Sequence, residues 1–337
     1  MKSKILVVTA SDEPNVEKVM QFLPSELVFR LNTDELLYET STFSFQVVAG
    51  GTSWHFRNRE NEVRSDEIKS IWYRRPARPK ARQEVLPKYS DFAENEAHKS
   101  LQSMWSTISE ETVLWMNHPR VLRELEFNQP YQLLVASHIG LSVPETLITN
   151  NPKEVSEFFE RWGGEVAIKT FGGSLTRDQE GSLLAVFTNR VSEEDLRKFS
   201  DEIRYAPVLL QSYVPKALEL RITVVGDKFF TCAIHSQDSP RTKDDWRRYD
   251  FERVRHEPYN LPLEIQAKLK TLMTNLKLVF GAIDMIVTPD GDYVFLEVNP
   301  SGQWGWIERI TGMSISKAIA DILIDPPIAT EKIPLLK

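Results

Sequence analysis

The sequence has one cysteine, Cys232, in 337 residues. A single cysteine excludes an internal disulfide and argues against a cysteine-rich zinc site. Because Cys232 lies in the apolar run FFTCAIH, we interpret it as a small buried hydrophobe and not as a nucleophile. The six histidines show no metal-ligand spacing, and the chain has no Gly-x-Ser-x-Gly motif. These absences argue against zinc chemistry and hydrolytic triads.

Long hydrophobic runs are also missing, since no apolar stretch approaches the roughly 20 residues that cross a bilayer. The apolar run at the N-terminus soon meets Asp12 and Glu13, which is typical of a first β-strand and not of a signal peptide. The net charge of −7 argues against a nucleic-acid-binding surface. We therefore expect a globular, cytoplasmic protein without a membrane or nucleic-acid partner.

The chain is too long for one ordinary core and predicts a mixed α/β fold of several domains. Lys4–Thr9 predicts a first strand, but no glycine-rich phosphate loop follows it, which argues against dinucleotide binding. Helical and strand patterns then alternate, and the break at 117–119 (Asn-His-Pro) marks a boundary. We predict an N-terminal α/β domain over 1–118, a central domain over 119–207 and a C-terminal domain over 208–337.

A hairpin is the most informative pattern in the chain. Ile283–Thr288 and Tyr293–Val298 are β-rich, and Asp290-Gly291 between them is a strong two-residue turn signal. Counting outward from that turn places Asp284 opposite Glu297 on the neighbouring strand. Side chains paired in this way lie roughly 4.5–5.5 Å apart at Cβ, where two like charges repel.

Asn299 follows Glu297 by two residues and shares its face while the strand continues. With Asp284, these side chains form an all-oxygen cluster of the kind that Mg²⁺ favours. The alternative is a solvated strand face with incidental acids. The apolar flanks argue for a packed sheet, in which unpaired acids are costly.

Lys169 ends an apolar strand and stands directly before a loop that contains Gly172 and Gly173. Backbone N–H groups of a glycine loop approach phosphate oxygens closely, and the lysine supplies a point charge. The pattern therefore suggests a phosphate site, although a lysine followed by glycines at a strand end is also a common structural feature.

A second connector runs through Gln211, Ser212, Tyr213 and Val214 and is ended by a proline, so its backbone is free to face a ligand. Two further candidates follow on a strand, where residues two apart share a face: these are Glu219 and Arg221. They form either a simple ion pair or a ribose-binding acid beside a phosphate-binding arginine.

Two polar and aromatic segments are candidates for substrate binding. One contains Gln237, Asp245 and Arg247, and suits a loop that grips a carboxylate-bearing or peptide substrate; the competing interpretation is a solvated loop. The other places Arg74 and Arg75 after an apolar strand, from which they could point into a cleft between domains.

The order of these motifs resembles the ATP-grasp superfamily: a lysine before a glycine loop, the Gln-x-Tyr-Val connector, Glu-Leu-Arg, and then an Asp, a Glu and an Asn. Three further segments resemble the graspetide, or microviridin-type, peptide ligases, which are related to ribosomal-protein glutamate ligases. These segments are Trp72–Pro76, Gln237 with 245–247, and Asn299–Glu308. The resemblance covers nearly the whole chain.

The resemblance implies an ATP-grasp fold that holds ATP between its central and C-terminal domains. ATP would phosphorylate an Asp or Glu side chain of a ribosomal precursor peptide, and a Thr or Ser hydroxyl or a Lys amine would attack the acyl phosphate to close an ester or amide ring. Lys169 and Arg221 would hold phosphates, Gln211–Val214 would meet the adenine, and Glu219 would lie near the ribose. Mg²⁺ would bind Asp284, Glu297 and Asn299.

By the same resemblance, the core peptide would be held by Arg74, Arg75, Gln237, Asp245 and Arg247, whose arginines could also stabilise the acyl phosphate. One departure concerns Asn128-Gln129, where many ATP-grasp enzymes carry a further phosphate-contacting lysine. A leader segment of the precursor could dock on the hairpin around Arg177 and Asp178. A homodimer is expected, because dimers are common in the family.

Two other functions remain open from the sequence. The chain could be an amino-acid ligase that adds glutamate or a similar unit to a protein or small molecule. It could also be a nucleotide-responsive protein that binds a peptide without catalysis. The choice of ester or amide depends on the nucleophile of the substrate, so the sequence does not decide it.

Overall fold

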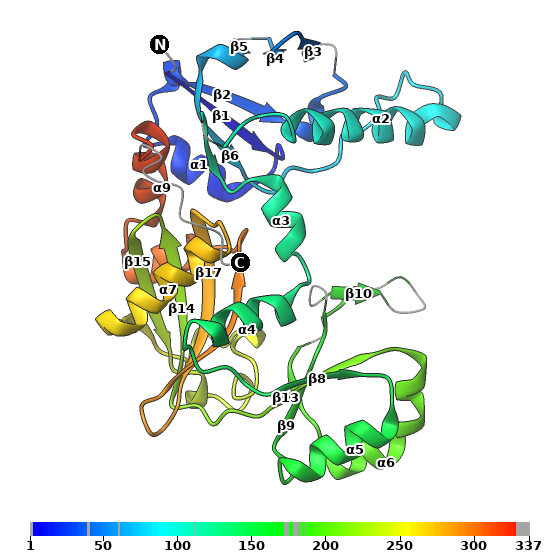
Figure 1. Cartoon of the computed structure of the whole chain (residues 1–337), viewed down its shortest axis with the longest axis vertical. Helices are drawn as coiled ribbons and strands as arrows, with labels where there is room; N and C mark the ends of the chain where they lie inside the picture. The colour runs from blue at the N-terminus through cyan, green and yellow to red at the C-terminus, as the bar shows by residue number, and fades with distance from the viewer. Residues whose placement is uncertain are drawn as a thin grey trace.

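The computed structural model describes residues 3–38, 41–59, 61–110, 112–171, 175–177, 181, 183–185 and 187–327. Figure 1 shows three parts: an N-terminal part at the top, a C-terminal part below it on the left, and a smaller central part at the lower right. The mixed α/β fold predicted from the sequence is confirmed. In the described part of the chain, no helix is long and apolar enough to cross a membrane.

A parallel four-stranded sheet forms the N-terminal part, with its strands in the order β2-β1-β6-β7. These strands are β1 (Lys4–Thr9), β2 (Val28–Asn32), β6 (Ile68–Tyr73) and β7 (Leu114–Met116). Successive strand residues point to opposite faces, and both faces are covered. Ile5 and Val7 pack with α1 (Pro14–Met20), whereas Leu6 and Val8 pack with α2 (Pro87–Trp105).

A small antiparallel sheet packs beside α2. It consists of β3 (Thr42–Val48), β4 (Gly51–Arg57) and β5 (Glu62–Arg64). The Phe56 ring stacks on Phe43 at 6.0 Å and on Trp105 of α2 at 5.9 Å between ring centroids, so the sheet shares the core of the N-terminal part.

The central part is an antiparallel sheet in the order β12-β9-β13-β8, covered by α5 (Pro152–Arg161) and α6 (Glu193–Phe199). Its strands are β8 (Thr146–Thr149), β9 (Val166–Lys169), β12 (Asn189–Arg190) and β13 (Val208–Ser212). A separate core around Phe158 and Leu210 stabilises it. Two further strands, β10 (Leu175–Arg177) and β11 (Leu183–Ala185), pair with each other as an antiparallel hairpin.

The C-terminal part is an antiparallel sheet in the order β16-β15-β14-β17-β18. Its strands are β14 (Leu218–Val225), β15 (Lys228–Ile234), β16 (His256–Pro258), β17 (Phe280–Val287) and β18 (Tyr293–Asn299). Helix α7 (Leu263–Asn275) packs on one face through Leu269 and Leu272. The other face packs on α8 (Gly305–Thr311) and α9 (Ile315–Ile324).

The residues at which one sheet ends and the next begins differ from the predicted domain boundaries. Helices α3 (Pro119–Leu125) and α4 (Gln129–His138) pack on the C-terminal sheet, because Leu125 and Leu133 join its core. Strand β13, which begins at 208, pairs with β9 and β8 of the central part. The central sheet with its own core therefore extends over 146–212, between α4 and β14.

Candidate active site

The metal hairpin forms with a longer turn than the sequence predicts. Thr288 pairs with Asp292 through its backbone N–H, so the loop has three residues and not the two of Asp290-Gly291. A bulge at Leu296 then shifts the register by one, and Asp284 faces Glu297 as predicted. The loop and the bulge each displace the register by one residue, in opposite directions, so the predicted pair is recovered.

Arg221, Asp284 and Glu297 form one row across three neighbouring strands. Their backbones pair in register, Arg221 with Asp284 and Asp284 with Glu297, so the three side chains share a face of the sheet. Nη1 of Arg221 lies 3.0 Å from each carboxylate oxygen of the buried Asp284. Burial raises the pKa of Asp284 and the charge of Glu297 adds to this, whereas Arg221 lowers it. The row therefore contains two carboxylates and one guanidinium, so one negative charge within the row is not balanced.

Asn299 lies two residues beyond Glu297, at the end of β18. Its side-chain oxygen accepts from the backbone N–H of Ser301 at 2.9 Å. Gly302 follows, and a Cβ there would lie 2.8 Å from Nη2 of Arg221 and press on the side chain of Ala282. The glycine thus allows the 300–303 segment to lie directly beside the Arg221 guanidinium.

Two glutamines of α4 hold the bulged part of β18. Gln129 donates to the carbonyl of Leu296 at 3.1 Å and lies 3.4 Å from the Glu297 carboxylate. Gln132 accepts from the backbone N–H of Val298 at 2.9 Å. The spacing of three places both side chains on one face of the helix, where both are buried. Position 129 is the site at which the sequence lacks the expected lysine, and its amide contacts a predicted metal ligand.

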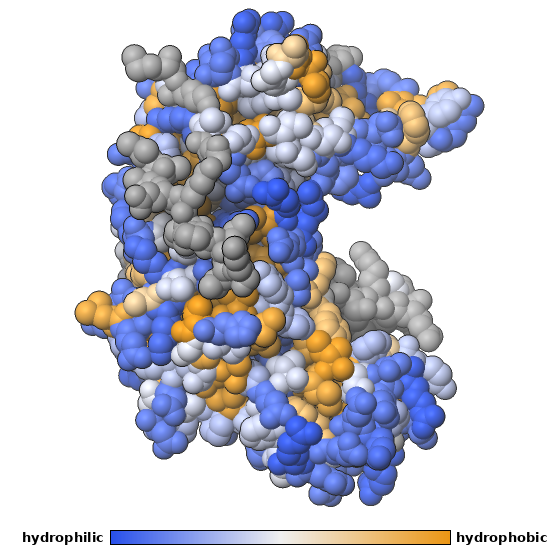
Figure 2. Space-filling model, in the orientation of Figure 1, coloured by the Kyte–Doolittle hydropathy of each residue, from blue (hydrophilic) through white to orange (hydrophobic). Residues whose placement is uncertain are grey.

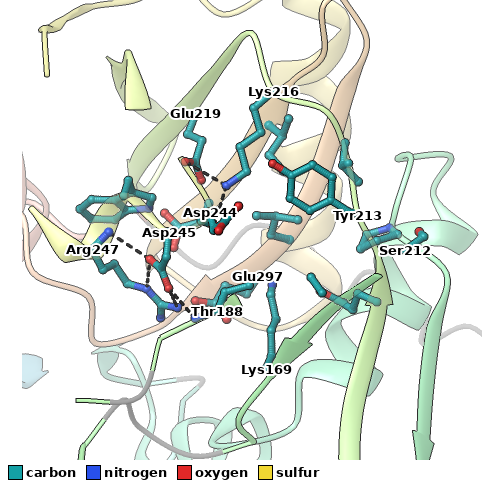
Figure 3. Close-up of a pocket in the computed structure, with 18 residues that line it drawn as sticks. Lys169, Thr188, Ser212, Tyr213, Lys216, Glu219, Asp244, Asp245, Arg247 and Glu297 are labelled. Atoms are coloured by element: carbon teal, nitrogen blue, oxygen red, sulfur yellow. Dashed lines mark hydrogen bonds and ion pairs between the residues drawn. The ribbon is translucent and has the colours of Figure 1, made fainter. Parts of the chain in front are cut away.

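A narrow cavity lies between β9, β13 and the C-terminal sheet (Figure 3). Its lining contains the predicted Lys169, the 211–214 connector and Glu219, together with Asp284 and Glu297. Lys169 extends toward Glu297 from the end of β9. Burial lowers the pKa of Lys169, and the charge of Glu297 opposes this. The cavity measures about 60 Å³, well below the roughly 300 Å³ of a typical ligand pocket, so its walls must separate to admit a nucleotide.

Lys216 is a cavity residue that the sequence did not indicate. Its ammonium lies 3.2 Å from the Glu219 carboxylate and donates to the carbonyl of Asp244 at 2.8 Å. Both side chains of the Lys216–Glu219 pair are buried, and burial raises the pKa of Glu219 while Lys216 lowers it. A signal was present, because an acid on an apolar strand requires a nearby cation, and Lys216 lies three residues before Glu219.

Asp245 and Arg247 close the other end of the cavity. The Asp245 carboxylate accepts from Nε and Nη2 of Arg247 at 2.9 and 2.7 Å and from the backbone N–H of Thr188 at 3.0 Å. Burial alone would raise the pKa of Asp245, but these hydrogen bonds and the Arg247 charge lower it to about 2. Asp245 is therefore a positioning group that ties Arg247 to the central part.

A large cleft of about 930 Å³ adjoins the narrow cavity. Figure 2 shows the surface hollowed between the N-terminal part at the top and the central part at the lower right. The two spaces share six lining residues: Lys169, Thr188, Trp246, Arg247, Asp284 and Glu297. A ligand in the narrow cavity and a ligand in the cleft would therefore meet at the same charged groups.

Two family models match the chain. The MvdD pre-ATP grasp domain covers residues 4–121, and the RimK-like ATP-grasp domain covers residues 128–323, which is more than half of the chain. The chain belongs to the RimK-like ATP-grasp family. It is an ATP-grasp ligase, and the resemblance inferred from the sequence is confirmed.

Solved structures are similar over nearly the whole length of this ATP-grasp ligase. A RiPP-associated ATP-grasp ligase from Chryseobacterium gregarium, in complex with ADP and a leader and core peptide, is 31% identical with a TM-score of 0.86, covering 97% of this chain and 98% of that one. The macrocyclase MdnC from Microcystis aeruginosa MRC, bound with precursor peptide MdnA, is 28% identical with a TM-score of 0.80, covering 96% and 100%.

A curated relative is the alpha-aminoadipate–LysW ligase LysX of Sulfurisphaera tokodaii. It is 24% identical over 201 residues, which are 56% of this chain and 65% of LysX. The match thus spans just under two thirds of that ligase.

Arg74 and Arg75 of the ATP-grasp ligase differ in their surroundings. Arg74 is buried, donates to the carbonyls of Ser301 and Gly302 at 2.9 and 3.1 Å, and lies 4.6 Å over the Trp304 ring. Burial lowers its pKa to about 10. It lines neither cavity, so its contacts suit an anchor for the 301–304 segment. Arg75 is exposed and lines the cleft.

The remaining predicted substrate residues are not gathered at the cleft. Gln237 donates to the carbonyl of Lys243 at 3.1 Å within its own loop and lines neither cavity. Asp178 lies outside the described residues, and Arg177 is described only as a backbone position in β10. Among the described residues, no group of three or more His, Cys, Asp or Glu side chains could hold a metal, so the candidate metal site of the ligase has two carboxylates and an amide.

Proposed function

We propose that this ligase closes rings in a ribosomally made precursor peptide at the expense of ATP. An Asp or Glu carboxylate of the peptide takes the γ-phosphoryl group, giving an acyl phosphate and ADP. A Thr or Ser hydroxyl or a Lys amine of the same peptide then attacks the carbonyl carbon, and phosphate leaves. Each ring is an ester or amide, and the peptide loses one water.

This proposal rests on one observation, which is that the narrow cavity and the large cleft meet at Asp284 and Glu297. The lining of the narrow cavity suits a nucleotide once its walls separate, and the cleft of about 930 Å³ has room for a peptide. Lys169 and Arg247 line both, beside Asp284 and Glu297. Phosphoryl transfer depends mainly on positioning and charge stabilisation, which such a junction supplies.

The donor set fits Mg²⁺. Glu297 forms no ion pair with any described residue, and it faces the carboxylate of Asp284. Carboxylate and amide oxygens are the ligands that Mg²⁺ prefers, and Asn299 supplies the amide. The metal would neutralise charge on the phosphates. Lys169, Arg221 and Arg247 would hold the phosphate oxygens, while the 211–214 connector would hold the adenine and Glu219 the ribose.

The relatives support the same substrate class. The Chryseobacterium ligase was solved with ADP and a leader and core peptide, and MdnC with a precursor peptide. Both structural similarities cover at least 96% of this chain, so they include the residues that line the cleft.

The match to LysX favours one second candidate, the ATP-dependent addition of an amino acid to a protein or small molecule. That reaction uses the same activated carboxylate but joins two molecules. It therefore adds mass to the acceptor, whereas ring closure removes water.

Mass spectrometry separates the two reactions. The enzyme is incubated with ATP, Mg²⁺ and a candidate precursor peptide, and the peptide is weighed before and after. We expect the loss of one water per ring, and no loss with Glu297→Gln. A gain in mass supports amino-acid addition, and an unchanged peptide under conditions that consume ATP contradicts ring closure.

A further inference from the structure

Among the residues that the structure describes, three arginines at or beside the N-terminal side of the cleft have no acidic partner. Arg75, Arg78 and Arg123 are exposed, and none forms an ion pair with the residues that the structure describes. The chain as a whole carries a net charge of −7, so acidic partners are abundant elsewhere. Three unpaired arginines near one another are therefore unusual for this surface.

Neutral side chains on one face of α2 accept hydrogen bonds from Arg78 and Arg123. Asn95, His98 and Gln102 follow each other at spacings of three and four, so they share a face of the helix. The amide oxygen of Asn95 accepts from Arg78, and that of Gln102 accepts from Arg123. A carboxylate at either position would cancel the charge, whereas an amide fixes the guanidinium and leaves the charge available.

His98 lies on α2 between the Arg78–Asn95 pair and the Arg123–Gln102 pair, and the charges of both arginines affect its pKa. Its Nε2 is 3.3 Å from the amide nitrogen of Gln102. Burial lowers the pKa of His98, and the charges of Arg78 and Arg123 lower it further. The surroundings of His98 thus disfavour an added positive charge and favour an anion.

Two arginines of the cluster face the same space as the candidate metal site, and Arg78 lies beside them against Asn95 of α2. Arg75, His98, Gln102 and Arg123 line the large cleft, which also contains Asp284 and Glu297. The acid that lines this side of the cleft is the exposed Glu126, which forms no ion pair with a described residue. An extended ligand could therefore touch the arginines at one end and the metal site at the other.

We propose that Arg75, Arg78 and Arg123 form a basic rim that binds carboxylate side chains of an acidic segment of the peptide substrate. The inference rests on the proposed function, which requires a peptide with Asp or Glu side chains. Guanidinium groups match carboxylates in a two-pronged geometry, so the rim would hold acids that are not being activated while another reaches the metal pair. Nucleic acid fits less well, because the chain has a net negative charge.

Fluorescence anisotropy with a defined probe tests the rim. The probe is a labelled peptide of alternating Thr and Glu, and a Thr/Gln peptide of equal length is the uncharged control. We expect the Thr/Glu peptide to bind the full-length protein more tightly, with an affinity that falls as salt rises. The double variant Arg78→Gln/Arg123→Gln should weaken its binding roughly tenfold, as two exposed charge pairs predict.

Arg120→Gln is the matched control, because Arg120 lies on α3 beside Arg123 but is paired with Glu110 at 2.8 Å. It should bind the Thr/Glu peptide as the wild type does. Equal binding of the two peptides by the wild type, or wild-type affinity in the double variant, overturns the rim. Stronger competition by a single-stranded oligonucleotide of equal charge also overturns it.

The rim and the proposed function can fail separately. If the wild type closes rings but the double variant binds the acidic peptide normally, the rim is wrong and the function stands. If the double variant loses affinity while the wild type leaves every candidate precursor unchanged, the rim stands and ring closure is wrong.

Discussion

At the residue scale, position 302 has no room for any side chain. A Cβ on Gly302 would press on Ala282 and lie 2.8 Å from Nη2 of Arg221. The ordered contacts of Arg221 with Asp284 leave the guanidinium little freedom to move away. The position of Arg221 beside Asp284 therefore requires a glycine at position 302.

Gly302→Ala should destabilise the protein by about 1–3 kcal/mol, the usual cost of adding a group to a packed site. It should also lower activity, because Arg221 must shift. Gly51→Ala is the control, since no atom lies within 4 Å of a Cβ there. Urea unfolding of both variants measures the difference, and equal stability would contradict the tight contact.

Asp245 predicts a defined dependence of stability on pH. Its pKa is lowered from 3.8 to about 2 in the folded protein. An acid with a lowered pKa stabilises the fold above its ordinary pKa and loses this contribution as the pH falls through the folded value. The shift corresponds to at most about 2 kcal/mol, because Arg247 is partly exposed.

Asp245→Asn should therefore be less stable than the wild type near neutral pH, and the difference should shrink as the pH falls from about 4 to about 2. Urea titrations at several pH values measure it. Asp238→Asn, at an exposed acid of the same loop region, should show little difference at any pH. A difference for Asp245→Asn that does not vary with pH would refute the assignment.

At the scale of the element, α4 and β18 act as one unit. The bulge at Leu296 interrupts the ladder, and the glutamines at 129 and 132 supply hydrogen bonds to the backbone on either side of Glu297. A buried polar group is costly when unpaired, so the bulge depends on these amides. The helix thereby fixes the direction of a candidate metal ligand.

Gln129→Leu should weaken Mg²⁺ binding about 10–100-fold, as is usual when a group that orients a metal ligand is lost. Titrating Mg²⁺ against the protein with fluorescent ADP measures this without turnover. Ser137→Ala, at the exposed end of the same helix, should leave the titration unchanged. An unchanged Mg²⁺ titration in Gln129→Leu would show that the amide does not position Glu297.

Strands with strong local patterns could be predicted from the sequence, whereas features that depend on distant contacts could not. Strong local patterns predicted β1 (Lys4–Thr9) to the residue, and the Asp284–Glu297 pair by counting along the strands. The bulge that restores this pair has no local signal, because it depends on α4, more than 150 residues earlier. Lys216 was missed although Glu219 lies only three residues away, and its other partner, the Asp244 carbonyl, meets it only in the folded chain.

At the scale of the whole molecule, the N-terminal and C-terminal parts share one core. Ile5 and Trp72 of the N-terminal sheet belong to the same cluster as Trp304 and Ile319. Trp304 is fully buried, lies 6.2 Å from Trp72 between ring centroids, and donates to Ser316 at 3.1 Å. The central part has a separate core around Phe158 and Leu210.

Trp304→Ala should destabilise the N-terminal and C-terminal parts together by about 3–5 kcal/mol. Hydrogen exchange should show faster exchange in β1 and β17, with less change in β9 and β13. Trp162→Ala, at a 37% exposed tryptophan of the central part, should have a small effect. Faster exchange limited to the C-terminal sheet would argue against a shared core.

The proposed ring closure depends on the activation of a side-chain carboxylate of the peptide by phosphorylation. The most direct measurement uses a precursor whose Asp and Glu side chains carry heavy oxygen, with analysis of the released phosphate by mass spectrometry. We expect ADP and one labelled oxygen atom in phosphate for each ring formed, because the acyl phosphate breaks at its carbonyl carbon. Unlabelled phosphate, or AMP and pyrophosphate in place of ADP, would contradict it.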